Sequence, residues 1–144
     1  MKKLLIVAVL GFALYGFYES HPGYVAAFQE QSAQSDELLE KAYQNRQSNI
    51  QVGGSGVVVR VLPDDLHGGR HQRFILELSS GQTVLVSHNI DLAPRVNALR
   101  KGDTIEFFGE YEWNSKGGVI HWTHHDPVGR HIGGWLKHHG STYQ

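Results

Sequence analysis

The feature that most constrains the fold is an alternation of apolar and polar side chains, repeated in short runs after residue 56. This alternation is typical of half-buried β-strands, because successive side chains of a strand point to opposite faces. The runs predict strands at 57–62, about 70–78, 83–88, 104–113 and 119–124. Turn residues rich in glycine separate the runs, and residues 91–99 suggest a short helix between the third and fourth strands.

Three strands, a short helix and two further strands are the element order of a five-stranded Greek-key barrel of the OB type. The short turns agree with closure of a small barrel. We therefore expect a mainly β domain, a small five-stranded OB-like Greek-key barrel with one short helix, preceded by an N-terminal export or anchor helix. An SH3-like barrel and an open meander have a similar succession of strands and are the alternatives.

The amino terminus has the pattern of an export segment. Lys2 and Lys3 precede an uncharged apolar run, residues 4–18, which would be about 22 Å long as a helix. This is shorter than the ~30 Å hydrocarbon core of a bilayer, which favours a signal peptide cleaved after Ala27. The alternative is an uncleaved segment that anchors the chain in the inner membrane. Both alternatives predict a domain that is periplasmic or secreted.

Composition divides the remaining chain into a spacer and a domain. Residues 28–53 are rich in Gln, Ser and Glu and predict a polar, partly helical spacer. The glycines around residues 53–56 mark the expected boundary. The predicted organisation is a signal peptide or anchor at 1–27, the spacer at 28–53, and an OB-like β domain with a His-rich C-terminal tail at 54–144.

Charge and residue usage narrow the partners and the chemistry. The chain has 13 Lys+Arg and 14 Asp+Glu, and this balance disfavours bulk binding of nucleic acid, which needs a basic excess. The absence of Cys excludes disulfides, thiolate zinc sites and cysteine nucleophiles. Ten histidines are present, and imidazoles with carboxylates suit zinc or another divalent transition metal.

Strand geometry limits which histidines could share a metal. His121 and His125 lie on one face of a strand but ~13 Å apart, too far for ligands of one ion. Ligands could converge where the strand ends, close to Pro127. The candidate metal ligands are His124, His125, Asp126 and His131, with His71 or His88 joining from neighbouring strands. We expect His67 in a loop and His138 and His139 in an exposed tail.

OB barrels bind ligands on the face of strands two and three, which here carries a mildly basic patch. The patch predicts a small or anionic ligand. The candidate binding residues are Arg70, His71, Arg73, His88, Asn89, Asp91 and His121. On the fourth strand, Glu106, Glu110 and Glu112 are expected to form a solvated face.

Three functions fit these features. The first is an exported, OB-like, His-rich binding module for a transition metal or an anionic ligand. The second is a metal-dependent envelope hydrolase, a phosphodiesterase or nuclease, in which Asp64, Asp65, His71 and Arg73 would hold metal and phosphate. The third is a structural envelope protein whose histidines make hydrogen bonds or sense pH. The motifs of P-loops and nucleophile elbows do not occur, so the sequence assigns no catalytic residue.

Several longer strings carry a resemblance. They are HQRFILEL, HNIDLAPRV, GEYEWN and GGVIHWTHHDP. On these strings the chain resembles an uncharacterised family of short exported bacterial proteins that is defined by a domain of unknown function. The resemblance covers about residues 53–144. It implies a small OB-like domain behind an N-terminal export segment, and it brings no activity or catalytic residue.

Overall fold

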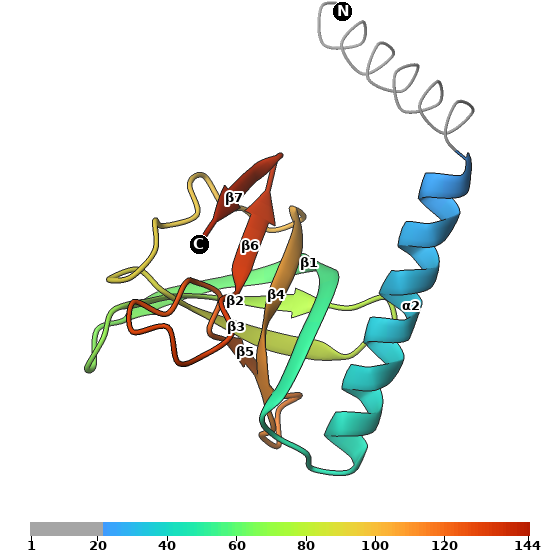
Figure 1. Ribbon diagram of the computed structural model, residues 1–144, viewed down its shortest axis with the longest axis horizontal. Helices are drawn as coiled ribbons and strands as arrows, with labels where there is room; N and C mark the ends of the chain where they lie inside the picture. The colour runs from blue at the N-terminus through green and yellow to red at the C-terminus, as the bar shows by residue number, and fades with distance from the viewer. Residues whose placement is uncertain (1–21) are drawn as a thin grey trace, which may run out of the picture. The chain divides into compact units, whose positions relative to one another are not determined.

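The structure is a computed structural model that describes residues 22–144 (Figure 1). Most of the predicted export segment, within residues 1–27, lies outside the described residues. The elements are α2 (Pro22–Gln44), β1 (Ile50–Asp65), β2 (His71–Glu77), β3 (Thr83–Asn89), β4 (Thr104–Glu112), β5 (Val119–His121), β6 (Trp135–His138) and β7 (Ser141–Tyr143). A boundary between two compact units falls after Ser32, and Ala33–Gln144 contains every described strand. No described helix is both long and apolar enough to cross a membrane.

Five strands close into a ring in the order β1-β2-β3-β5-β4, and β4 pairs again with β1 (Figure 1). Neighbours in the ring are antiparallel, except for β3 and β5, which are parallel. The ring closes because β1 is long: its first half pairs with β4 and its second half with β2. Val57 lies where the two halves meet and pairs with Glu77 on one side and Thr104 on the other. The predicted mainly β, OB-like fold is confirmed.

The apolar faces of the strands fill the inside of the ring. Alternate residues of β2, β3 and β4 are buried and their neighbours are partly exposed, as the sequence pattern predicts. The largest fully buried side chains are Tyr111, Phe74 and Phe107. The hydroxyl of Tyr111 donates a hydrogen bond to the carbonyl of Gly117, so the one polar atom of this buried ring is paired.

The glycines expected to mark a domain boundary lie inside β1 instead. Gly53 and Gly54 pair with Phe108 and Phe107 of β4, so the strand begins at Ile50, before the predicted boundary. A Cβ atom at Gly54 would lie 2.8 Å from the ring of Phe107. The absence of a side chain at Gly54 makes room for the large core side chain of Phe107 where the ring closes. Glycine in this run therefore indicates a close approach between two strands and not a turn.

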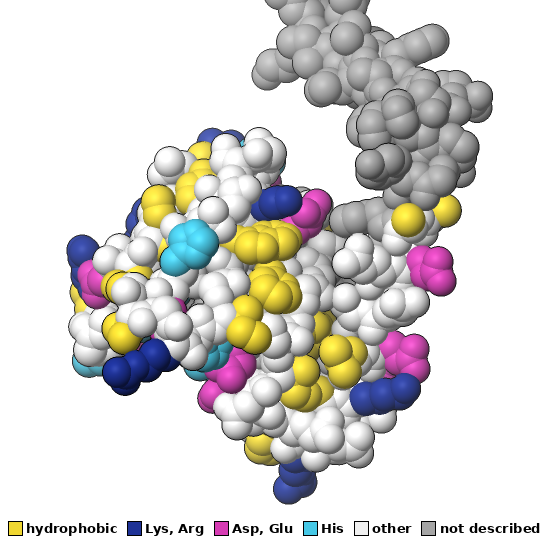
Figure 2. Space-filling view, viewed as in Figure 1, with side chains coloured by type: hydrophobic (Ala, Val, Ile, Leu, Met, Phe, Trp, Pro, Cys, Tyr) yellow, Lys and Arg dark blue, Asp and Glu magenta, His cyan; other side chains and the backbone are white. Residues whose placement is uncertain are grey.

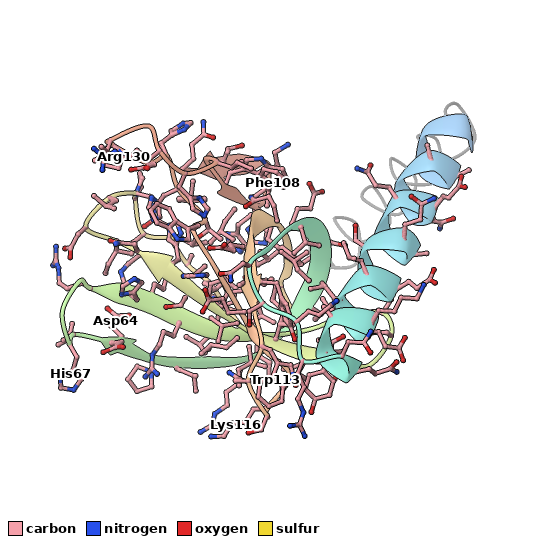
Figure 3. The ribbon with its side chains drawn as sticks, turned by 60° about the horizontal axis from the view of Figure 1, so that its bottom comes forward. Asp64, His67, Phe108, Trp113, Lys116 and Arg130 are labelled. Carbon is pink, nitrogen blue, oxygen red and sulfur yellow. The ribbon has the colours of Figure 1, made fainter. Side chains whose placement is uncertain are left out.

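The C-terminal half of α2 is part of the domain. Leu39 and Ala42 are fully buried in the core, and the carboxylate of Asp36 accepts a hydrogen bond from the hydroxyl of Ser79. The indole N–H of Trp113 donates to the carbonyl of Tyr43, 3.0 Å away. Figure 3 shows Trp113 at the end of the ring where α2 terminates. The C-terminal half of this helix, which lies in the region predicted as a spacer, thus packs on the ring.

The short helix predicted at residues 91–99 is wrong. The side-chain oxygen of Asn89 accepts the backbone N–H groups of Asp91 and Leu92, which holds the chain in a turn. Further along, the buried Gln72 side chain donates to the carbonyl of Val96 and accepts its N–H. These two bonds replace the hydrogen bonds that a helix would make. They hold residues 91–99 against β2 as a non-helical segment.

The C-terminal segment is a hairpin rather than a tail. β6 pairs with β4, extending the sheet beyond the ring, and β7 pairs with β6 (Figure 1). Leu136 lies in the core, and His138 is buried, with 3% of its surface exposed. The expectation of an exposed His138 is therefore wrong. His138 lies on the same buried face of β6 as Leu136, although its neighbours in the sequence are polar. His139 is exposed at the hairpin turn, as expected.

Candidate functional site

The charged candidate residues of the first binding patch are engaged with one another or with the backbone. Asp91 accepts the backbone N–H and the side-chain Nε–H of Arg70, and these bonds hold the pKa of Asp91 below its usual range. Arg73 donates twice to the carbonyl of Pro63. Asp64 forms an ion pair with Arg95. Figure 3 shows Asp64 and His67 near the tip of the β1–β2 hairpin. These groups hold loops together and leave no free cluster of cations.

His88 has a structural environment. Its Nε2–H donates to the carbonyl of Pro94 at 2.9 Å, and its Nδ1 lies 2.7 Å from the hydroxyl of Thr123. The ring has no exposed surface, and its burial lowers the pKa to about 4. His88 is therefore neutral near pH 7, with both nitrogens occupied, and it lies beneath the surface that carries the other candidates.

Asp126 organises a loop. Its carboxylate accepts the backbone N–H groups of Val128, Arg130 and His131, which holds its pKa below the usual range. His125 is exposed beside this loop. The predicted ligands His124, His125, Asp126 and His131 are not among the groups whose donor atoms converge within the described residues.

Charged side chains of both signs intermingle on the face seen in Figure 2, without a broad patch of either sign. This distribution agrees with the near-zero net charge of the chain. This face therefore lacks the broad basic patch that bulk electrostatic binding of nucleic acid uses.

One such group lies on the outer face of β4 and β5 and consists of Glu110, Glu112 and His121, here called the β4–β5 cluster. Glu110 and Glu112 are two residues apart on one strand, so their side chains share a face. His121 pairs directly with Glu110 across the antiparallel ladder. One donor atom from each of the three residues lies within 4.8 Å of the other two.

The imidazole of His121 lies between the two carboxylates. Its Nε2 is 3.4 Å from Oε2 of Glu110 and 3.4 Å from Oε1 of Glu112. The nitrogen is itself buried and makes no hydrogen bond, although the ring is partly exposed. Two ligands that bind one metal at ~2.0–2.1 Å in a tetrahedral arrangement lie about 3.4 Å apart. Both separations match that value.

His131 and Trp122 complete the surroundings of Glu110. Nδ1 of His131 lies 2.8 Å from the carbonyl of Ile132, and Nε2 lies 3.1 Å from Oε2 of Glu110. The His131 ring stacks on Trp122, with centroids 4.0 Å apart and an angle of 8° between planes. Trp122 has a φ of 54°, a strained conformation of the kind that gathers at functional sites.

A pocket of about 220 Å³ adjoins the β4–β5 cluster and shares His121 with it. Its lining also includes His71, Ser87, Asn89, Leu92, Trp122 and His124. Nδ1 of His71 donates to the carbonyl of Gly69, and Nδ1 of His124 donates to that of His125, at 2.8 and 2.7 Å. Each ring then offers Nε2 as its remaining nitrogen. The structure thus brings together four predicted residues: His71, Asn89, His121 and His124.

A second group of converging donor atoms comprises Asp103, His138 and His139. It lies on the turn before β4 and on the β6–β7 hairpin, apart from the first pocket's lining residues. Its histidines were expected in an exposed tail, and Asp103 was not among the predicted candidate residues. No periodicity in the sequence connects these positions, because the pairing of β6 with β4 creates the contact.

Glu110 and Glu112 were missed as candidate ligands because their alternation on β4 was interpreted as a solvated face. A signal was available in the turn that joins β4 to β5. Asn114 accepts the N–H groups of Lys116 and Gly118 in that turn, which fixes the hairpin register. Counting back from the turn on both strands pairs Glu110 with His121.

Comparison with known proteins gives a family but no activity. A family model described as "Protein of unknown function (DUF3465)" matches residues 23–144. This match confirms the predicted resemblance to an uncharacterised family. No curated protein matches the chain.

Proposed function

The chain belongs to the family of proteins of unknown function DUF3465, and we propose that it is a binding protein for a divalent transition metal. The β4–β5 cluster would supply the ligands: Glu110, Glu112 and His121. The observation that carries the proposal is the buried, unpaired Nε2 of His121, held 3.4 Å from a carboxylate oxygen on each side. An ion there would pair this nitrogen and neutralise both carboxylates.

The donor set favours borderline metals. One imidazole and two carboxylates suit Zn²⁺ and its neighbours, whereas Mg²⁺ and Ca²⁺ prefer oxygen ligands alone. The three residues leave a fourth tetrahedral position for water or a bound molecule. His131 hydrogen-bonds Glu110 and would act as a positioning residue for that ligand.

Titration with Zn²⁺ tests the proposal. We expect the full chain to bind Zn²⁺ in calorimetry more tightly than ~10 μM, which corresponds to about 7 kcal/mol. His121→Ala and Glu112→Gln should each weaken binding at this cluster at least tenfold, because each removes a ligand. Glu77→Gln, at the exposed end of β2, is the matched control and should bind Zn²⁺ as the wild type does.

A spectroscopic measurement locates the ion. Trp122 stacks on His131, which contacts Glu110, so occupation of the cluster should change the fluorescence of this indole. Zn²⁺ affinity that is unchanged in His121→Ala, together with unchanged fluorescence on titration, would remove the β4–β5 cluster as the site.

The neighbouring pocket supports a second candidate function, hydrolysis of a small phosphoester. A zinc ion with an open position lowers the pKa of bound water and polarises phosphoryl oxygens. The pocket of about 220 Å³ shares His121 and Trp122 with the site and would accommodate the substrate. A panel of phosphodiester and phosphomonoester substrates with Zn²⁺ tests this function. Equal turnover by the wild type and His121→Ala would refute it.

Export of the domain is part of the proposal. The support is the basic and apolar pattern of residues 1–27, with residues 4–18 as the anchor in the uncleaved form. Cell fractionation and N-terminal sequencing of the mature protein would distinguish a cleaved periplasmic form from an anchored form. A full-length chain in the cytoplasmic fraction would contradict export.

A further inference from the structure

We propose that Asp103, His138 and His139 form a second site for a divalent transition metal, independent of the β4–β5 cluster. The site would take a borderline cation such as Zn²⁺, Ni²⁺ or Cu²⁺, because two imidazoles and one carboxylate suit these ions better than Mg²⁺ or Ca²⁺. It lies where the β6–β7 hairpin meets the turn that precedes β4.

The donor atoms are already close together. Nε2 of His138 lies 2.7 Å from Oδ2 of Asp103, and Nε2 of His139 lies 3.8 Å from Oδ1. Ligands of one zinc ion lie about 3 Å apart at right angles and about 3.4 Å apart in a tetrahedron. The two distances involve different oxygens of Asp103, and the shorter one is a hydrogen bond that the ring of His138 makes to the carboxylate. A bound ion would replace the proton of that bond, and small side-chain rotations would bring one donor atom of each residue to it.

The hairpin turn explains how two consecutive histidines face one carboxylate. Side chains that follow each other in a strand point to opposite faces. His139 and Gly140 instead have φ angles of 48° and 79°, as in a type I′ turn. This conformation places the rings of His138 and His139 side by side, with centroids 3.9 Å apart and planes at 21°.

Histidine is an uncommon residue for the backbone conformation that His139 adopts in this turn. A type I′ turn strongly prefers Asn-Gly, since its first position needs a positive φ that asparagine tolerates well. Here histidine occupies that position. The strained conformation is thus combined with a metal-binding side chain aimed toward Asp103, and strain of this kind gathers at ligand sites.

The carboxylate is held firmly in place. The backbone of Asp103 bonds to that of Val58 and Arg100, and its Oδ2 also accepts the N–H of Arg100 at 2.9 Å. These bonds fix the position of the carboxylate, which faces the imidazoles of both His138 and His139.

The site is open to solvent. A cavity of about 430 Å³ adjoins it and is lined also by Thr104, Glu106 and Lys137. The ammonium of Lys137 lies 4.8 Å from the centre of the Trp135 ring and makes a cation–π interaction with it. The cavity has room for the water ligands that complete the coordination of a metal bound by three residues.

The test measures Zn²⁺ binding to the full chain in which the first site has been removed. In Glu112→Gln/His121→Ala we expect one equivalent of Zn²⁺ to bind, against two for the wild type. Adding His139→Asn should weaken this remaining binding at least tenfold, because it removes one imidazole ligand. Asparagine suits the turn, so the thermal midpoint should be unchanged or higher, which separates loss of a ligand from loss of the hairpin.

His67→Asn, in an exposed loop, is the matched control and should leave binding unchanged. Zn²⁺ affinity in the double variant that does not respond to His139→Asn overturns the second site. If the double variant instead binds the same number of ions as the wild type, and His139→Asn weakens that binding, the β4–β5 cluster fails and the hairpin site stands.

Discussion

Acidification should destabilise the fold through His88. The ring is fully buried, and both of its nitrogens have partners that suit the neutral imidazole, namely the carbonyl of Pro94 and the hydroxyl of Thr123. Burial lowers its pKa from the ordinary 6.5 to about 4. Below pH 6.5 the unfolded chain therefore takes up a proton that the folded protein resists. Stability is fully present above pH 6.5 and is lost as the pH falls toward 4.

The size of the effect follows from the two pKa values. One pKa unit corresponds to about 1.4 kcal/mol, so the complete transition of His88 is worth about 3 kcal/mol. At pH 5 the unfolded imidazole is almost fully protonated while the folded one is still mostly neutral. The loss between pH 7.5 and pH 5 is then about 2 kcal/mol, a large share of the stability of a small domain.

Urea unfolding of the wild type and of His88→Gln at several pH values isolates this contribution. Glutamine can donate to Pro94 and accept from Thr123 without titrating, so it keeps the polarity of the site. We expect the variant to be the less stable protein at pH 7.5 and the gap to narrow by about 2 kcal/mol at pH 5. Parallel profiles of the two proteins over this range would refute the argument.

Two further predictions concern residues of β1 and β2, in the ring of strands. Gly54→Ala should destabilise the protein by about 1–3 kcal/mol through overpacking, because its Cβ would lie 2.8 Å from the ring of Phe107. Gly53→Ala, whose Cβ would meet Phe108 at an ordinary 3.4 Å, is the control and should cost less than Gly54→Ala in thermal unfolding. Gln72→Leu should cost about 2 kcal/mol and speed hydrogen exchange at Val96, because it leaves that buried peptide group without partners. Slow exchange at Val96 in that variant would contradict the role given to Gln72.

The order of the strands could be predicted because it depends on local signals. Each strand shows its own alternation, and the turns between them carry glycine or asparagine at the positions that need them. The buried faces of β2 and β4, which include Phe74 and Phe107, agree with the pattern. The failures lie where tertiary contacts override local preference. Residues 91–99 have a helical pattern, but Gln72 holds Val96 in a different conformation.

The candidate site was only partly predictable for the same reason. His121 was identified as a binding candidate, but its carboxylate neighbours depend on the register of β4 against β5. Exposed acidic residues on a strand are normally solvated, and nothing in the strand alone distinguishes Glu110 and Glu112 from that common case. Asp103 and His138 are still further apart in sequence, and they meet because β6 adds to the edge of β4.

The double pairing of β1 has a consequence for how the chain folds. Val57 pairs with Glu77 across the hairpin of β1 and β2, which are close in sequence. Its other partner, Thr104, is much further along the chain, after β2, β3 and residues 91–99. Contacts between distant residues form slowly, because a long loop must lose entropy before they are made. The β1–β2–β3 meander should therefore form first and the seam between β1 and β4 last, with folding in the millisecond-to-second range. The glycines of β1 lie along its pairing with β4. The two strands that pair last are therefore also those between which a side chain at Gly54 would clash with Phe107.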